Sequence, residues 1–247
     1  MSKIKVDIDV IENNLKNIGY IINNIATGEN NGTNWKITFS NSGAIATIYD
    51  SNRVKNTVVN GKCNQAEKEQ LKAIIDGLKS GEYTADPLNE TIVKLILSRK
   101  EDYYYDFKET QYGKNKKYDL LHDIICLLNN TANREAYLII GVTNDYEPIG
   151  VEQSIESNNL VDWFKHLAFA GNVVPDIEVK HLFYTYKKID VIVCKPSFNV
   201  PYYLEKREGK VEPFHIYTRV GDTNTPVNEN ASHEDVCKLW KYHFSNN

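Results

Sequence analysis

Two stretches decide the fold of this chain. Residues 101–109 run Glu-Asp-Tyr-Tyr-Tyr-Asp-Phe-Lys-Glu, and residues 138–145 run Leu-Ile-Ile-Gly-Val-Thr-Asn-Asp. The first carries strand-forming aromatic residues between acidic ones, and the second is an apolar strand that ends in a polar turn. An apolar helical pattern lies between them. We expect both acidic clusters to meet at one edge of a sheet.

The elements around these stretches follow from hydrophobic spacing. Residues 118–130 have the broad apolar face of a helix packed on a sheet, with His122 and Asp123 on its polar side. His122 is expected to be solvated or to cap the helix. Further along, the pattern predicts a strand at 136–142, a helix at 160–170, a hairpin around Lys187-Lys188, strands at 201–204 and 214–220, and a C-terminal helix opened by Ser232.

The N-terminal part carries a pattern of its own. It predicts a helix within residues 4–25, three strands at 35–39, 44–49 and 57–59, and a helix at 65–78 that Asn64 caps. Residues 80–87 are rich in turn residues, and a short helix at 89–98 follows. We therefore expect two domains, residues 1–85 and 86–247. The fold class is α+β: a mixed sheet flanked by helices, preceded by a small helix–three-strand–helix domain.

Composition restricts the functional class. The net charge is −4, so a nucleic-acid surface would have to be a local patch. The four cysteines are single and far apart, which favours buried free thiols over a zinc site. The N-terminus lacks the apolar run of a signal peptide, and no apolar stretch approaches the roughly 20 residues of a membrane span. These features predict a soluble, cytoplasmic protein that does not bind membranes.

The acidic residues suggest a particular chemistry. Hard divalent cations such as Mg²⁺ or Mn²⁺ prefer oxygen ligands, and one or two carboxylates with a phosphate suffice to hold them. Such a cation can neutralise a scissile phosphodiester and activate water. The candidate ligands are Glu101, Asp106, and either Asn144 or Asp145, while Lys108 could contact the phosphate as a point charge. The other interpretation is a surface acidic cluster with Lys108 as its ion-pair partner.

Three motifs, in order along the chain, resemble the Schlafen AlbA_2 family, a divergent AlbA-type nucleic-acid-binding domain. Glu101-x4-Asp106-Phe-Lys108 is similar to the family's Glu-x4-Glu-Phe-Lys. The 138–145 stretch with Pro148-Ile-Gly-Val is the second motif. The third is Arg219-Val-Gly-Asp-Thr-Asn-Thr-Pro, which resembles Arg-Val-Gly-Ser-x-x-x-Pro. Together they cover about residues 90–235.

The resemblance implies a specific activity. In RNA-cleaving Schlafens, acids matching Glu101 and Asp106, with a third after the Gly-Val strand, form a nuclease site that acts on tRNA and other structured RNA. The chain departs from that pattern twice. Asp106 replaces a glutamate, and the third acid aligns with Asn144, with Asp145 one step later. The catalytic candidates are therefore Glu101, Asp106, Lys108 and Asp145, in a metal-dependent RNA endonuclease.

Binding would need cations and aromatic rings near this site. Tyrosines near the motif could stack on unpaired bases: Tyr103, Tyr104, Tyr105 and Tyr112. Basic residues that could contact phosphate form two clusters, and a single arginine follows on the strand before the third motif's loop. These residues are Lys114, Lys116, Lys117, Lys206, Arg207, Lys210 and Arg219.

Other functions stay open at this point. The domain could bind RNA or DNA without cleaving it, or serve as an assembly subunit of a toxin, phage-defence or regulatory complex. The order of elements in residues 1–85 is similar to the TATA-binding-protein-like repeats that begin some bacterial ribonuclease toxins. That part could dock a partner or a nucleic acid, or be purely structural. A homodimer or larger complex is expected, because the chain holds one copy of a domain that family members use in pairs.

Overall fold

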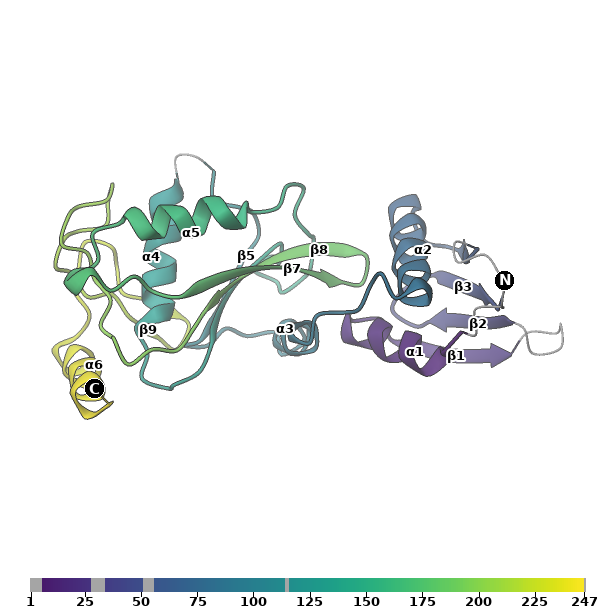
Figure 1. Ribbon diagram of the computed structural model, residues 1–247, viewed down its shortest axis with the longest axis horizontal. Helices are drawn as coiled ribbons and strands as arrows, with labels where there is room; N and C mark the ends of the chain where they lie inside the picture. Colours follow the sequence, from purple (N-terminus) through teal and green to yellow (C-terminus); the bar gives the residue numbers. More distant parts are fainter. Residues whose placement is uncertain (1–5, 28–33, 51–55, 114–115, 247) are drawn as a thin grey trace. The chain divides into compact units, whose positions relative to one another are not determined.

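The computed structural model describes residues 6–27, 34–50, 56–113 and 116–246 (Figure 1). These residues form two compact units. The first contains the described residues up to Ser98 together with Leu182–Lys188, and the second contains Arg99–His181 and the described residues from Ile189 onward. Both units combine helices with a sheet, so the α+β class predicted from the sequence is confirmed.

The first unit is built on an antiparallel sheet in the order β1-β2-β3-β4. Its strands are β1 (Ile22–Thr27), β2 (Asn34–Phe39), β3 (Ala44–Tyr49) and β4 (Val58–Gly61), and its helices are α1 (Ile8–Asn17), α2 (Gln65–Ser80) and α3 (Leu88–Leu97). Alternate residues of β3 are buried, as expected for a strand with one face in the core. Leu71 and Ile75 of α2 belong to the same core.

The sequence predicted part of this unit correctly. Asn64 caps α2, because its side-chain oxygen accepts a hydrogen bond from the Glu67 amide at 2.8 Å. The prediction that the first helix extends toward residue 25 was wrong, because α1 ends at Asn17. Gly19 has φ +90°, which ends the helical path, and the isoleucines that follow pair with β2 as a fourth strand.

The second unit has a mixed sheet in the order β5-β6-β8-β7. β5 (Tyr105–Lys108) and β6 (Ala136–Ile140) are parallel and joined through α4 (Lys117–Leu128), whereas β6 and β8 (Lys187–Cys194) are antiparallel. β7 (Ile177–Tyr184) lies at the other edge. All five residues of β6 are buried, as predicted for a central strand. The apolar face of α4 packs with β6 in one core.

Short elements complete the second unit. α5 (Ser157–His166) and the 3₁₀ turn η2 (Ala170–Asn172) precede β7, and β9 (Arg219–Val220) pairs with β10 (Thr223–Asn224). α6 (His233–Asn246) begins after Ser232, whose hydroxyl oxygen accepts a hydrogen bond from the Asp235 amide at 3.1 Å. The predicted helix cap is confirmed.

Three predictions for this part of the chain were wrong. The β7–β8 hairpin turns at Thr185-Tyr186 instead of Lys187-Lys188, because Thr185 adopts φ +55°. Residues 201–204 form no strand, and only Arg219–Val220 of the 214–220 segment does. Both segments contribute buried side chains such as Leu204 and Tyr217. Their apolar residues therefore resemble those of a strand in the sequence, although the segments do not pair as strands in a sheet.

Candidate functional site

The edge strand β5 brings the first motif to the sheet. Asp106 lies opposite Leu138 and Lys108 opposite Ile140 of the parallel strand β6. The Lys108 carbonyl also accepts hydrogen bonds from the Gly141 and Val142 amides, at 2.8 and 3.2 Å. The two stretches that decide the fold therefore meet at one edge of the sheet, as the sequence predicted.

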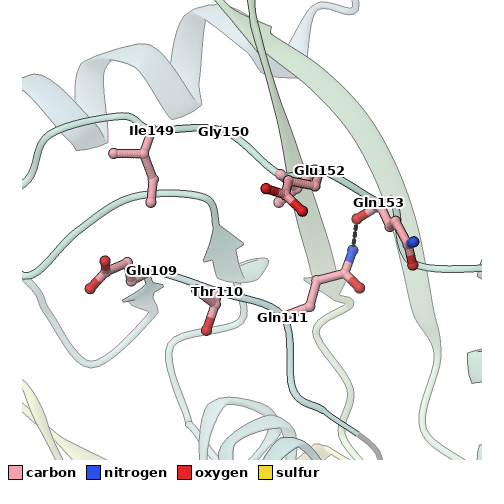
Figure 2. Close-up of a pocket in the computed structure, with 8 residues that line it drawn as sticks. Glu109, Thr110, Gln111, Ile149, Gly150, Glu152 and Gln153 are labelled. Carbon is pink, nitrogen blue, oxygen red and sulfur yellow. Dashed lines mark hydrogen bonds between the residues drawn. The ribbon is translucent and has the colours of Figure 1, made fainter.

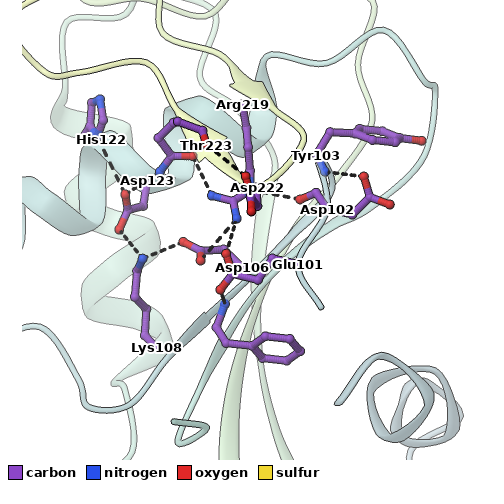
Figure 3. A network of polar contacts seen from close by, with 12 residues as sticks. Glu101, Asp102, Tyr103, Asp106, Lys108, His122, Asp123, Arg219, Asp222 and Thr223 are labelled. Atoms are coloured by element: carbon purple, nitrogen blue, oxygen red, sulfur yellow. Dashed lines mark hydrogen bonds and ion pairs between the residues drawn. The ribbon is translucent and has the colours of Figure 1, made fainter. Parts of the chain in front are cut away.

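Arg219 lies at the centre of the polar network in Figure 3. Its Nη2 is 2.6 Å from Glu101 Oε2 and 3.5 Å from Asp106 Oδ1. Its Nε donates to the Asp102 carbonyl at 2.9 Å, and its Nη1 donates to Asn224 Oδ1 at 2.8 Å. The side chain is only 2% exposed, so Arg219 holds the two carboxylates together from inside the protein.

Asp106 is almost fully buried beside Lys108. The Lys108 ammonium lies 2.7 Å from Asp106 Oδ2, an atom that accepts no hydrogen bond of standard geometry from the described residues. Burial raises the pKa of Asp106 to about 6, against the charges of Lys108 and Arg219, which lower it. Burial lowers the pKa of Lys108, but Asp123 and Asp106 outweigh it, so the net shift is upward.

Asp123 forms the opposite side of the network and was missed by the sequence analysis. Its Oδ2 lies 3.5 Å from the Lys108 ammonium and accepts a hydrogen bond from the Tyr112 hydroxyl. Its Oδ1 accepts from Asn224 Nδ2 at 2.8 Å. Burial would raise the pKa of Asp123, but His122, Lys108 and Tyr112 outweigh burial and lower it.

A signal for Asp123 was present in the sequence. With His122, Asp123 interrupts the apolar run from Leu120 to Leu128, and an acid within a helix that packs on a sheet needs polar partners. The expectation that His122 is solvated or a cap was wrong. His122 is 8% exposed, and its ring packs edge-on against Tyr217 at 4.7 Å.

An open polar pocket of about 390 Å³ lies over this network. Glu101, Asp106 and Lys108 line it, and so does Asn144 from the turn after β6. Asp145 does not belong to the lining; it is exposed, and its carbonyl accepts a hydrogen bond from Arg99 at 2.8 Å. Of the two alternatives for the third position, the structure places Asn144 at the pocket.

The carboxylates do not present a ready site for a divalent cation. Glu101 Oε1 accepts a hydrogen bond from the Phe107 amide at 3.1 Å, and Glu101 Oε2 faces Arg219. Both oxygens of Asp106 face a cation, Lys108 or Arg219. Within residues 6–27, 34–50, 56–113 and 116–246, no group of three acidic, histidine or cysteine side chains is arranged to hold a metal. The expected Mg²⁺ or Mn²⁺ does not fit this arrangement unless Lys108 moves.

The basic residues predicted to bind phosphate differ in their exposure and in their ion-pair partners. Lys114 lies outside the described residues, and Arg219 is buried in the network. Three others lie on the surface beside partners: Lys117 over the Trp163 ring, Lys210 with Asp119, and Arg207 with Glu212. Lys116 and Lys206 are exposed.

A second pocket, of about 440 Å³, lies between residues 109–111 and 149–153 (Figure 2). The Gln111 side-chain amide donates to the Gln153 carbonyl and bridges the two segments. Glu109 and Glu152 supply its charges, and its described lining includes no lysine or arginine. A phosphate group therefore suits the pocket over Lys108 better than this one.

Comparison with protein-family models identifies a family for the second unit. The model of the family described as "Schlafen, AlbA_2" matches residues 101–228, more than half of the 247 residues. No curated protein matches the chain significantly. None of the helices in the described part of the chain is long and apolar enough to cross a membrane.

Two solved structures show low similarity to parts of this chain. One is the N-terminal domain of a RecG-related, ATP-dependent DNA helicase-like protein from Nitrosomonas europaea, with 16% identity, a TM-score of 0.36, and coverage of 57% of this chain and 92% of that one. The other is the DIP2311 protein from Corynebacterium diphtheriae, also with 16% identity and a TM-score of 0.36. That match covers 63% of this chain and about a third, 32%, of the other. On the extent of the family match, the chain belongs to the Schlafen AlbA_2 family.

Proposed function

We propose that this protein binds RNA at the pocket over Lys108 and cleaves the phosphodiester backbone there, with tRNA or another structured RNA as substrate. Family membership supports the coarser statement, a nucleic-acid-related function. The observation that carries the finer proposal is the convergence of Glu101, Asp106 and Lys108 on one open polar pocket. Buried carboxylates with shifted pKa values in a pocket are typical of functional sites.

Each residue has a role that follows from its surroundings. Lys108 is partly exposed and carries a positive charge that two aspartates stabilise, so it can contact a phosphate at the pocket floor. Asp106, with a pKa of about 6, is close to half-protonated slightly below neutral pH and can accept or donate a proton. Arg219 fixes Glu101 and Asp106 relative to each other and is a positioning residue.

A second candidate function is supported by a different observation. Lys108 and Arg219 already neutralise the two family acids, and the third family position at the pocket is Asn144, which carries no charge. A site with this balance could hold an RNA or DNA backbone without cutting it. The alternative is a non-catalytic nucleic-acid-binding module.

One experiment separates the two functions. The purified protein is incubated with total tRNA in Mg²⁺, in Mn²⁺ and in EDTA, beside Glu101→Gln and Asp106→Asn, and the RNA is resolved on denaturing and native gels. Asp119→Asn is the matched control, because Asp119 is an acid of α4 that pairs with Lys210 and does not line the pocket. The EDTA arm tests whether cleavage depends on a divalent cation, which stays a prediction from the family resemblance.

The outcomes are distinct. Discrete fragments from the wild type and Asp119→Asn, lost in both pocket variants, would support cleavage at this site. Intact tRNA with a salt-sensitive mobility shift would contradict cleavage and support the binding module. Absence of both fragments and shift would contradict either function and favour an assembly subunit.

A further inference from the structure

The tyrosines around the pocket are not equivalent in the structure. Tyr105 is buried, and the Tyr112 hydroxyl donates to Asp123. The face of the Tyr104 ring is covered by the Arg134 guanidinium, 3.4 Å from the ring centroid. Tyr103 is different: it is partly exposed, and the residue lines a cavity of about 350 Å³. Of the four candidates for stacking on a base, Tyr103 is therefore the one that the structure presents to a cavity.

The cavity beside Tyr103 has walls from three other parts of the second unit. Val220 of β9 lines it, although the side chain is 60% exposed, and Leu239 of α6 supplies a buried apolar surface. Asn130 and Thr131, which follow α4, provide polar groups. The ion pair of Asp235 and Lys238 in α6 also belongs to the lining. An aromatic residue, aliphatic walls and polar groups together suit a flat ligand with a polar edge.

The polar groups are able to bind such an edge. Asn130 Nδ2 donates to the Leu127 carbonyl at 2.8 Å, and its Oδ1 accepts from the Ala132 amide at 3.1 Å. An amide side chain has two N–H donors and two acceptor sites, so Asn130 retains one donor and one acceptor for a ligand. Thr131 is exposed and adds a hydroxyl.

This cavity adjoins the pocket over Lys108. Arg219 lines both, and its Nε donates to the carbonyl of Asp102, the residue between Glu101 and Tyr103. Glu101 lines one cavity and Tyr103 the other, and their Cα atoms can be no more than about 7 Å apart, because only Asp102 lies between them in the chain. Figure 3 shows the Tyr103 ring directed away from the carboxylates of Glu101 and Asp106.

We propose that this cavity binds the unpaired base of a nucleotide whose phosphate, or whose neighbour's phosphate, lies in the pocket over Lys108. The Tyr103 ring stacks on the base, Val220 and Leu239 cover its other side, and Asn130 and Thr131 face its polar edge. The inference rests on the proposed function, and it adds that the site selects single-stranded or flipped-out nucleotides over paired ones.

The test measures how much of the affinity comes from bases. Binding of a fluorescent uridine octamer is compared, by anisotropy in EDTA, with binding of an octamer of abasic ribose phosphates that has the same charge. The variants are Tyr103→Leu, Tyr103→Phe and Val220→Ser; Val220 is exposed enough that its replacement leaves the core intact. Stacking on one aromatic residue contributes about 1–3 kcal/mol, so base removal should weaken wild-type binding on the order of tenfold or more.

The expected pattern is specific to stacking. Tyr103→Leu should bind both octamers with nearly the same affinity, Tyr103→Phe should keep the wild-type preference, and Val220→Ser should lose part of it. Equal wild-type affinity for the two octamers, or an undiminished preference in Tyr103→Leu, would overturn the base cavity and leave the phosphate pocket standing. Failure of the wild type to bind either octamer would overturn this inference, whereas the proposed function is overturned by the absence of both cleavage and a mobility shift with tRNA.

Discussion

Asp106 and Asp123 both lie beside the Lys108 ammonium group, but their pKa values shift in opposite directions. Both are buried, and the Lys108 ammonium lies 2.7 Å from Asp106 and 3.5 Å from Asp123. Burial nevertheless raises the pKa of Asp106 to about 6, whereas the pKa of Asp123 stays below its usual range. Because the cation is shared, the difference has to come from the other groups around each carboxylate.

Hydrogen-bond donors account for the difference. Asp123 accepts hydrogen bonds from the Tyr112 hydroxyl and the Asn224 amide, and His122 lies 3.7 Å away. Among the described residues, Asp106 is paired with Lys108 and Arg219, the latter at 3.5 Å, and Glu101 adds a like charge. Two carboxylates whose environments move their pKa values in opposite directions are suited to different roles. Asp106 is the group able to exchange a proton near neutral pH, and Asp123 is a fixed anion that holds Lys108.

The largest expected effect comes from removing Arg219, the cation that pairs with both Glu101 and Asp106. Arg219→Ala leaves these acids without the buried guanidinium, so we expect the free energy of unfolding to fall by about 3–5 kcal/mol. Urea denaturation followed by circular dichroism measures it. Arg207→Ala is the control, an exposed arginine paired with Glu212, and it should change stability by less than about 1 kcal/mol. Similar losses in both would mean that the buried network contributes no more than a surface ion pair.

A smaller loss is expected at Asp123. Asp123→Asn keeps the shape of the side chain but removes the charge that faces Lys108. It also turns an NH₂ group toward one of the two donors, Tyr112 or Asn224, so the free energy of unfolding should fall by about 1–3 kcal/mol. Thermal unfolding is the measurement. Asp119→Asn, one turn earlier in α4 and paired with Lys210 at the surface, should be nearly neutral. Equal effects would show that Asp123 is not held as a fixed anion.

The pH dependence of stability distinguishes Asp106 from an ordinary carboxyl. The raised pKa means that the native state binds a proton more tightly than the unfolded state between pH 3.8 and about 6. The contribution of Asp106 therefore favours folding at low pH and is lost as the pH rises through that window, by up to about 1.4 kcal/mol per pH unit. Denaturation midpoints across the window, in wild type and Asp106→Asn, measure it. The prediction fails if the wild-type and variant curves run parallel.

The smallest effects, on RNA affinity, are expected from the exposed lysines Lys206 and Lys210. Lys206→Ala and Lys210→Ala should weaken RNA binding slightly and uniformly across sequences, and each should reduce the slope of log affinity against log salt by about 1 if it contacts a phosphate. Lys165→Ala is the control, an exposed lysine on α5 that pairs with Asp162. Unchanged slopes in both variants would remove these lysines from the interface.

The sequence predicted the parts of this structure that depend on local pattern. The apolar run at 136–142 became the central strand, Asn64 and Ser232 became helix caps, and the first motif met the turn after β6 at one sheet edge. These features follow from spacing of two or 3.6 residues and from capping chemistry, which neighbours along the chain determine.

Other parts depended on contacts between distant residues. Asp102 and Asp106 bond to Arg219, more than a hundred positions later, and Asn224 joins Arg219 to Asp123. No local pattern indicates such a pairing. Arg219 was therefore predicted as a surface contact to phosphate, and Asp123 was not counted in the site. The sequence analysis also predicted a strand that does not form, because the apolar residues of 201–204 are buried without pairing as a strand.

The measurement that tests the central claim most directly is a carboxyl titration of the intact protein by carbon-13 NMR, with Asp106→Asn and Asp123→Asn to assign the two signals. The account predicts that Asp106 titrates near pH 6 and that Asp123 remains ionised below the usual range of aspartate. If both titrate together near pH 4, the network around Lys108 holds two carboxyl groups with ordinary pKa values. Asp106 would then have no special capacity to exchange a proton, and the division of roles between the two carboxylates would be wrong.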